Sequence, residues 1–180
     1  GTEFEPQPWP KDGVPSTRGW RVMEGAEDSI AATKLFLETC PTIDKTVILG
    51  VSMGGNATGL ALALAAGEEK PGGGPLFDYW IDAEGAVNVT ETYFGARGLA
   101  AGNEFAANAH ADIVEEMGGE FEEDPAPYAE HSVVTRIDEI KASGVKGVVV
   151  IHGLNDGLVP YNQSRELVAG LAAQQIPVDM

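Results

Sequence analysis

VILGVSMGGN, residues 47–56, is the stretch that decides the fold of this chain. A short apolar run, 47–49, leads into Gly-Val-Ser-Met-Gly, and a run of small and apolar residues, 57–66, follows it. The motif Gly-x-Ser-x-Gly holds a serine exposed for nucleophilic attack when it lies on a sharp turn between a strand and a helix. We therefore predict that Ser52 is a nucleophile. The alternative is a serine in an ordinary loop, because the motif is short enough to arise by chance.

The chemistry of a serine nucleophile explains each part of this motif. A serine hydroxyl is a weak nucleophile, so it has to be held exposed on a tight, strained turn. Gly50 and Gly54 remove the β-carbons that would collide where the strand and the helix approach each other. The helix that begins behind Ser52 directs backbone N–H groups and a partial positive charge at a developing oxyanion.

Composition limits the class of protein. The chain has 180 residues, enough for one domain with a sizeable core. Its net charge is −17, from 11 Lys and Arg against 28 Asp and Glu, which argues against a nucleic-acid partner. Cys40 is the single cysteine, so no internal disulfide forms. No stretch is long and apolar enough to span a membrane. We expect a soluble protein and leave open whether it is cytoplasmic or secreted.

Helices and strands alternate along most of the chain. We expect strands at 45–51, 76–81, 146–151 and 175–180, and helices at about 20–40, 53–66, 134–142 and 161–174. Helices between short, buried strands predict an α/β fold with a doubly wound, mostly parallel sheet. We see no domain boundary, so residues 1–180 are expected to form a single domain.

Residues 83–132 interrupt this alternation. We expect a helix at 98–117, followed by the acidic, proline-containing loop GGEFEEDPAP at 118–127. An insertion at this point is placed to cover the top of the sheet, which predicts a lid or a pocket wall. A surface elaboration without substrate contact fits the sequence equally well.

A second candidate site residue follows the apolar strand at 146–151. Asp156 lies in HGLNDGLVP, residues 152–160, just past the carboxyl end of that strand. Functional loops of open α/β sheets lie at this edge, which is also the edge that carries Ser52. The alternative is a turn aspartate, because Asn-Asp-Gly favours turns by itself.

Two segments resemble the α/β-hydrolase family, most closely the prolyl oligopeptidase-like serine hydrolases and related esterases. They are GVSMGG at 50–55 and PYAEHSVVTRIDEIKASGVKGVVVIHGLNDGLVPYNQS at 127–164. The resemblance spans roughly residues 20–180. It implies a catalytic triad in the chain order serine, aspartate, histidine. Ser52 then corresponds to the nucleophile and Asp156 to the acid.

The resemblance also implies parts that this sequence does not contain. The family's histidine is expected after Met180, and the first strands and the second oxyanion donor are expected before Gly1. The backbone N–H of Met53 is the one oxyanion donor that the resemblance places here. We therefore expect an α/β-hydrolase fold that is incomplete at both ends. Missing chain segments, or a complementing chain, would complete it.

Other polar residues are weaker candidates. His152 is a pocket candidate and a possible substitute for the base, although its position is usually structural or pocket-lining. His131 and His110 are expected to be structural or solvated. Asp82, after the strand at 76–81, is a rival of Asp156 for the acid and is expected to be structural. No His, Cys and Asp cluster has zinc spacing, so no metal is implied, and no cofactor is expected.

The sequence predicts a serine hydrolase that cleaves carboxylic esters through an acyl-enzyme on Ser52. A prolyl oligopeptidase-like serine peptidase is the first alternative, and a non-catalytic binding protein with a hydrolase fold is the second. The expected partner is a small-molecule acyl ester or a peptide.

Overall fold

A parallel sheet forms the centre of the molecule. The computed structural model describes residues 19–180. In that range four strands lie side by side in the order β1 (Val47–Val51), β2 (Tyr79–Ala83), β3 (Gly147–Ile151) and β4 (Val178–Asp179). All the pairings are parallel, with Gly50 opposite Asp82 and Asp82 opposite Val150. The carboxyl ends of the strands therefore meet at one edge of the sheet.

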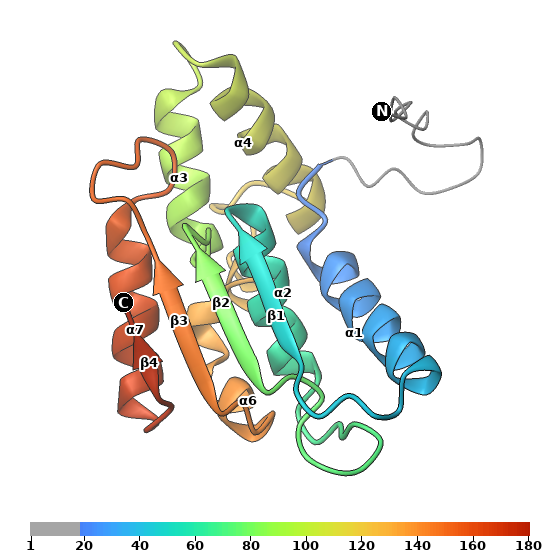
Figure 1. The fold of residues 1–180 in the computed structure, drawn as a ribbon. Helices are drawn as coiled ribbons and strands as arrows, with labels where there is room; N and C mark the ends of the chain where they lie inside the picture. Colours follow the sequence, from blue (N-terminus) through green and yellow to red (C-terminus); the bar gives the residue numbers. More distant parts are fainter. Residues whose placement is uncertain (1–18) are drawn as a thin grey trace, which may run out of the picture.

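The described helices cover one face of this sheet and its carboxyl edge (Figure 1). They are α1 (Val22–Thr39), α2 (Met53–Leu64), α3 (Val89–Leu99), α4 (Glu104–Met117), α5 (Ala126–Glu130), the short 3₁₀ helix η1 (Val133–Thr135), α6 (Ile137–Ala142) and α7 (Tyr161–Ala173). Successive strands are added in one direction, and right-handed crossovers then bring their connections to the same face. α2 is central to this layer and packs against α1, α6, β1 and β2. No helix in the described part of the chain is long and apolar enough to cross a membrane.

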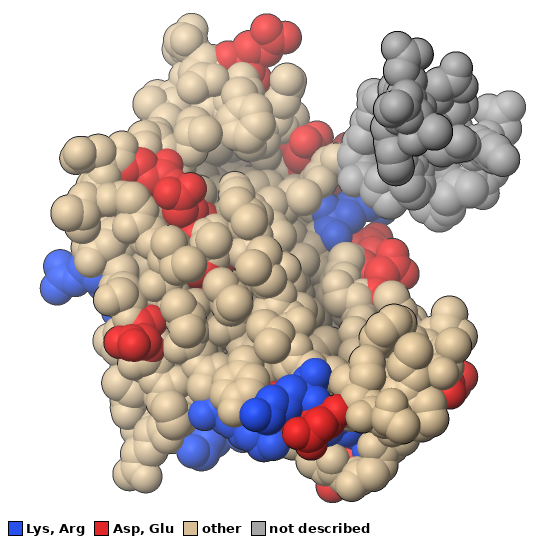
Figure 2. Space-filling view, viewed as in Figure 1, with Lys and Arg blue, Asp and Glu red and all other residues tan. Residues whose placement is uncertain are grey.

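The two faces of the sheet differ in burial. Side chains alternate along each strand, so that Ile48, Trp80 and Val148 are buried against the helices. On the opposite face Leu49 and Val149 are 57% and 43% exposed. Figure 2 shows this second face as a broad, mostly uncharged surface over the strands. The mostly parallel α/β sheet predicted from the sequence is confirmed, and among residues 19–180 the helices shield one of its faces.

The helices of the insertion at 83–132 differ from their prediction. The helix expected at 98–117 corresponds to α4, which begins only at Glu104, and the helix before it, α3, was not predicted. Asn103 caps the second helix, with its side-chain oxygen accepting the Ala106 N–H at 3.2 Å. Gly118 ends α4 in the left-handed conformation, with φ of 78°.

Two further boundaries were wrong. β2 runs from Tyr79 to Ala83 rather than over 76–81, because Leu76 and Phe77 are buried in the loop before it. The loop expected at 118–127 ends earlier, because the helix α5 begins at Ala126. The first turn of α5 contains a proline, a residue suited to a helix start.

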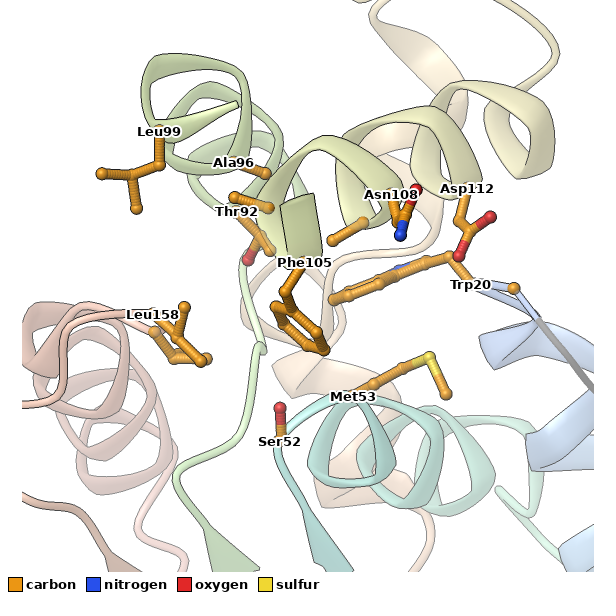
Figure 3. A pocket seen from close by; sticks show the side chains of 14 residues that line it. Trp20, Ser52, Met53, Thr92, Ala96, Leu99, Phe105, Asn108, Asp112 and Leu158 are labelled. Atoms are coloured by element: carbon orange, nitrogen blue, oxygen red, sulfur yellow. The ribbon is translucent and has the colours of Figure 1, made fainter. Parts of the chain in front are cut away.

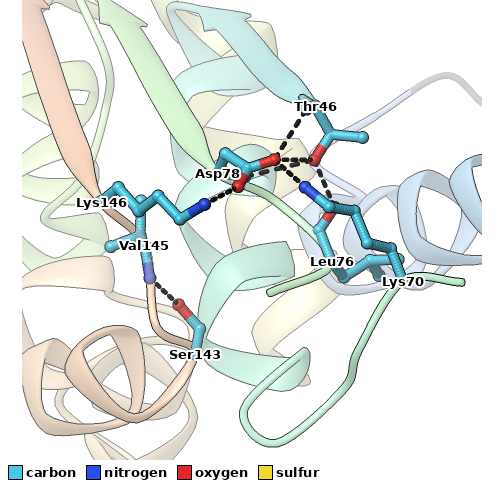
Figure 4. A network of polar contacts seen from close by, with 7 residues as sticks. All are labelled: Thr46, Lys70, Leu76, Asp78, Ser143, Val145 and Lys146. Carbon is cyan, nitrogen blue, oxygen red and sulfur yellow. Dashed lines mark hydrogen bonds and ion pairs between the residues drawn. The ribbon is translucent and has the colours of Figure 1, made fainter. Parts of the chain in front are cut away.

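A buried ion pair joins the opposite edge of the sheet, where the strands begin (Figure 4). The fully buried Asp78 carboxylate is paired with the ammonium groups of Lys70 and Lys146, the latter at 2.6 Å. It also accepts the Thr46 N–H at 2.9 Å. Burial raises the pKa of Asp78, but the bonds from Lys146, Lys70 and Thr46 outweigh burial and hold the pKa well below its usual range. These contacts connect the chain before β1, the loop before β2 and the chain before β3.

Candidate active site

Ser52 occupies the corner between β1 and α2. Its backbone has φ of 54° and ψ of −122°, a conformation that costs free energy for any residue with a β-carbon. The Ser52 N–H donates to the Ala83 carbonyl at 2.9 Å. The Ser52 carbonyl accepts the N–H groups of Gly55 at 2.9 Å and Ala86 at 3.0 Å. These bonds to α2, to the end of β2 and to the loop after it hold the strained corner in place.

Glycine is required on both sides of this corner, although not at both predicted positions. A β-carbon on Gly50 would lie 2.0 Å from the Gly54 carbonyl oxygen, so β1 and α2 touch there as predicted. A β-carbon on Gly54 would meet nothing within 4 Å. The second close approach is at Gly55, where a β-carbon would lie 2.3 Å from Asp82 Oδ1. The prediction was therefore wrong for Gly54, because the helix faces the sheet one residue later.

The hydroxyl of Ser52 lies at the N-terminus of a helix. Ser52 is exposed, and Met53 is the first residue of α2. The N–H groups of a first helical turn have no acceptor within the helix, and the helix dipole adds a partial positive charge there. The Met53 N–H belongs to this first turn.

Ser52 lines a mostly apolar pocket of about 260 Å³. In Figure 3 the Ser52 hydroxyl points up into it, beneath the ring of Phe105 and between Leu158 and Met53. The side chains that Figure 3 labels around the pocket are Trp20, Ser52, Met53, Thr92, Ala96, Leu99, Phe105, Asn108, Asp112 and Leu158. Such a pocket suits an apolar group held next to the serine.

Most of one wall of this pocket comes from the insertion at 83–132. Thr92, Ala96 and Leu99 lie on α3, and Phe105, Asn108 and Asp112 lie on α4. The sequence analysis did not single out Trp20, Phe105 or Leu158 as pocket residues, because they come from three separate segments that no local pattern connects.

Asp156 supports the loop that forms another part of the pocket. Its Oδ1 accepts the N–H groups of Leu158 at 2.8 Å and Val159 at 3.0 Å, and both of these residues line the pocket. Asp156 itself is not among the lining residues. The parallel sheet places Asp156 and Ser52 at the same edge, after β3 and β1, with β2 between them.

The His152 side chain is fully buried beside this loop. Nδ1 is 2.6 Å from Ser164 Oγ and Nε2 is 2.9 Å from the Val159 carbonyl, so both ring nitrogens are engaged. Nε2 also lies 3.6 Å from Asp156 Oδ2. These contacts fix the loop, and His152 is not among the residues that line the Ser52 pocket.

The other two histidines also lie outside the pocket lining. His131 ends α5, and its Nδ1 is 2.8 Å from the carbonyl of Pro127 in the same helix. His110 stacks on Tyr93, with ring centroids 4.9 Å apart. Neither contact brings an imidazole to Ser52.

Asp82 is buried under the corner rather than exposed in the pocket. It is fully buried, and neither carboxyl oxygen has a hydrogen-bond partner among residues 19–180. Burial raises the pKa of Asp82 to about 7. The Gly85 N–H lies beside the carboxyl group without the geometry of a full hydrogen bond, and it offsets part of that rise. In the described range, no three His, Cys, Asp or Glu side chains gather closely enough to hold a metal ion.

Comparison with solved structures shows the fold. Dipeptidyl peptidase 4 of Porphyromonas gingivalis matches with a TM-score of 0.65 and 18% identity, over 89% of this chain and 19% of its own. A puromycin-hydrolyzing peptidase of Mycobacterium tuberculosis matches with a TM-score of 0.63 and 22% identity, over 86% of this chain and 20% of its own. Esterase B of Lactobacillus rhamnosis matches with a TM-score of 0.60 and 16% identity, over 86% of this chain and 47% of its own.

These structures are longer than the chain described here. The chain spans about a fifth of the two peptidases and about half of the esterase. No curated protein sequence matches it significantly. The model of the prolyl oligopeptidase family, however, matches residues 22–180, which is most of the sequence. The chain therefore belongs to the prolyl oligopeptidase family, a family of serine hydrolases with the α/β-hydrolase fold.

Proposed function

We propose that the protein cleaves carboxylic esters by acyl transfer from Ser52 to water. The observation that carries this proposal is the position of Ser52, held at a strained corner with its hydroxyl facing an apolar pocket. A serine that is exposed at the N-terminus of a helix has the surroundings that acyl transfer requires.

In this proposal the Ser52 Oγ attacks the ester carbonyl carbon while a general base takes the hydroxyl proton. The Met53 N–H stabilises the oxyanion, and the protonated base gives its proton to the leaving alcohol. Water then attacks the acyl-enzyme and releases the carboxylic acid. The base is the histidine that the family resemblance places after Met180. Asp156, which holds the loop beside the pocket, would orient that imidazole.

A peptidase is the second candidate, and the family match and the peptidases among the similar structures favour it. The two substrates differ in chemical demand, because an amide leaving group must be protonated before it departs and its carbonyl is less reactive. We expect the full-length protein to hydrolyse a p-nitrophenyl acyl ester with a higher kcat/KM than a dipeptidyl p-nitroanilide. Preferential cleavage of the anilide would replace the ester proposal with the peptidase one.

We also propose that the insertion at 83–132 forms a wall of the acyl pocket. Ala109 lines this pocket from α4, so a tryptophan at 109 would fill part of its volume. We expect Ala109→Trp to lower kcat/KM for a p-nitrophenyl octanoate at least about tenfold and to spare the acetate ester. Ala111→Trp is the matched control, because Ala111 is exposed on the same helix and does not line the pocket. Equal activity of both variants on both esters would show that the insertion does not contact the substrate.

A further inference from the structure

The Asp82 carboxyl group is the one buried acid of the core whose oxygens both lack a partner among residues 19–180. The other fully buried aspartate, Asp78, is paired with two lysines. A buried carboxylate without a counter-charge or hydrogen bonds costs several kcal/mol, so such a group favours its neutral form. No cation is paired with the Asp82 carboxylate, so protonation is the way in which the cost of burying its charge can be relieved.

Two glycines make room for this carboxyl group. A β-carbon on Gly55 would lie 2.3 Å from Asp82 Oδ1, and one on Gly85 would lie 2.0 Å from the same atom. Gly55 belongs to the first turn of α2, and Gly85 belongs to the loop after β2. Asp82 is thus enclosed between the helix that begins behind Ser52 and the loop that bonds to Ser52.

Asp82 lies next to the turn that carries Ser52. Asp82 pairs with Gly50, two residues before Ser52, and the next residue, Ala83, accepts the Ser52 N–H. Its carboxyl group faces the first turn of α2, whose N–H groups would stabilise an oxyanion on the acyl group of Ser52. A negative charge on Asp82 would compete with the oxyanion for this positive end of the helix.

The elements next to Asp82 carry few other ionisable side chains. α2, β1 and β3 contain no Asp, Glu, Lys, Arg or His, so the elements packed around Asp82 add no charge. Glu84, in the loop after β2, and His152, directly after β3, are the ionisable residues that follow these strands most closely in the sequence. The Glu84 carboxylate accepts the Gly153 N–H at 3.3 Å, and the His152 ring is bonded to Ser164 and Val159.

We propose that Asp82 is a positioning residue that must be protonated for Ser52 to react, so that its ionisation sets an alkaline limit on activity. The proposal rests on the function proposed for Ser52. Burial raises the pKa of Asp82 to about 7, which places the limit near neutral pH. The histidine base, which must be neutral, limits activity on the acidic side instead.

The test is the rate at which the full-length protein reacts with a fluorophosphonate probe between pH 6.5 and 9.5. The wild type should react about ten- to a hundredfold more slowly at the alkaline end, because an ionised Asp82 would oppose the negative charge that develops in the transition state. Asp82→Asn, which stays neutral, should hold its rate across this range. Glu84→Gln is the matched control, because it removes the neighbouring carboxylate and should keep the alkaline decline of the wild type.

An alkaline decline that persists unchanged in Asp82→Asn, or a wild type without such a decline, would overturn the proposal. If Asp82→Asn does not fold, the pKa of Asp82 in the wild type can be measured instead by NMR titration of its carboxyl carbon. Ionisation of Asp82 below pH 5 would contradict the proposal. A protein whose Ser52 does not react at any pH would instead refute the proposed function. The two failures are therefore distinguishable.

Discussion

Replacing Ser52 by alanine should lower kcat/KM for ester hydrolysis at least about a thousandfold, because the variant cannot form the acyl-enzyme. The fold should not change. Alanine carries a β-carbon as serine does, so the cost of the backbone φ of 54° is the same in both proteins. We expect equal melting temperatures and circular dichroism spectra. An alanine variant that retains the wild-type rate would show that another residue is the nucleophile.

Ser52→Gly separates catalysis from strain at the same position. Glycine adopts a positive φ without steric cost, so this variant should be inactive and also more stable than the wild type by about 1 kcal/mol. The comparison with Ser52→Ala is made by urea unfolding. If Ser52→Gly is less stable than Ser52→Ala, the corner does not store the strain that its backbone angles indicate.

Replacing Asp78 by alanine should have the largest effect on stability. The substitution leaves the Lys70 ammonium, whose side chain is 5% exposed, without its buried partner. Breaking such a pair costs about 3–5 kcal/mol, which corresponds to a fall in melting temperature of roughly 10 °C. Lys146→Met is the comparison, because the Lys146 side chain is 52% exposed and its loss leaves Asp78 paired with Lys70, so the fall in melting temperature should be smaller. A melting temperature for Asp78→Ala within 2 °C of the wild type would contradict this account of the ion pair.

The same pair gives a pH dependence with a definite sign. The pKa of Asp78 is lower in the folded protein than in the unfolded chain, so its contribution to stability is fully present above the unfolded value of about 4. The contribution is lost as the pH falls from there through the lower, folded pKa. The difference in unfolding free energy between wild type and Asp78→Ala should therefore shrink on acidification.

Sequence alone predicted well the segments whose residue pattern favours the same structure that they adopt in the folded protein. The run at 47–51 and the run at 147–151 are short, β-branched and bounded by turn residues, and both are strands. The setting of Ser52 could be predicted because a strand, a tight turn and a helix are all encoded within ten residues.

The parts that sequence missed depend on contacts between distant segments. The break between α3 and α4 falls in an alanine- and glycine-rich run that carries no strong stop signal, and the Asn103 cap decides it. The pocket combines Trp20, Leu158 and two helices of the insertion, and no local pattern connects them. The burial of Asp82 depends on Gly55 and Gly85, which lie on different elements.

The most direct measurement of the central claim is to map the site of covalent modification in the full-length protein. After reaction with a fluorophosphonate, digestion and mass spectrometry identify the residue that carries the phosphonyl group, with heat-denatured protein as the control for nonspecific reaction. The account predicts a single adduct on Ser52 that is absent from the denatured protein and from Ser52→Ala, and a loss of esterase activity in proportion to labelling. Stoichiometric modification of a different serine, or full activity after Ser52 has been modified, would contradict it. So would a folded protein with a histidine after the last strand whose Ser52 remains unmodified.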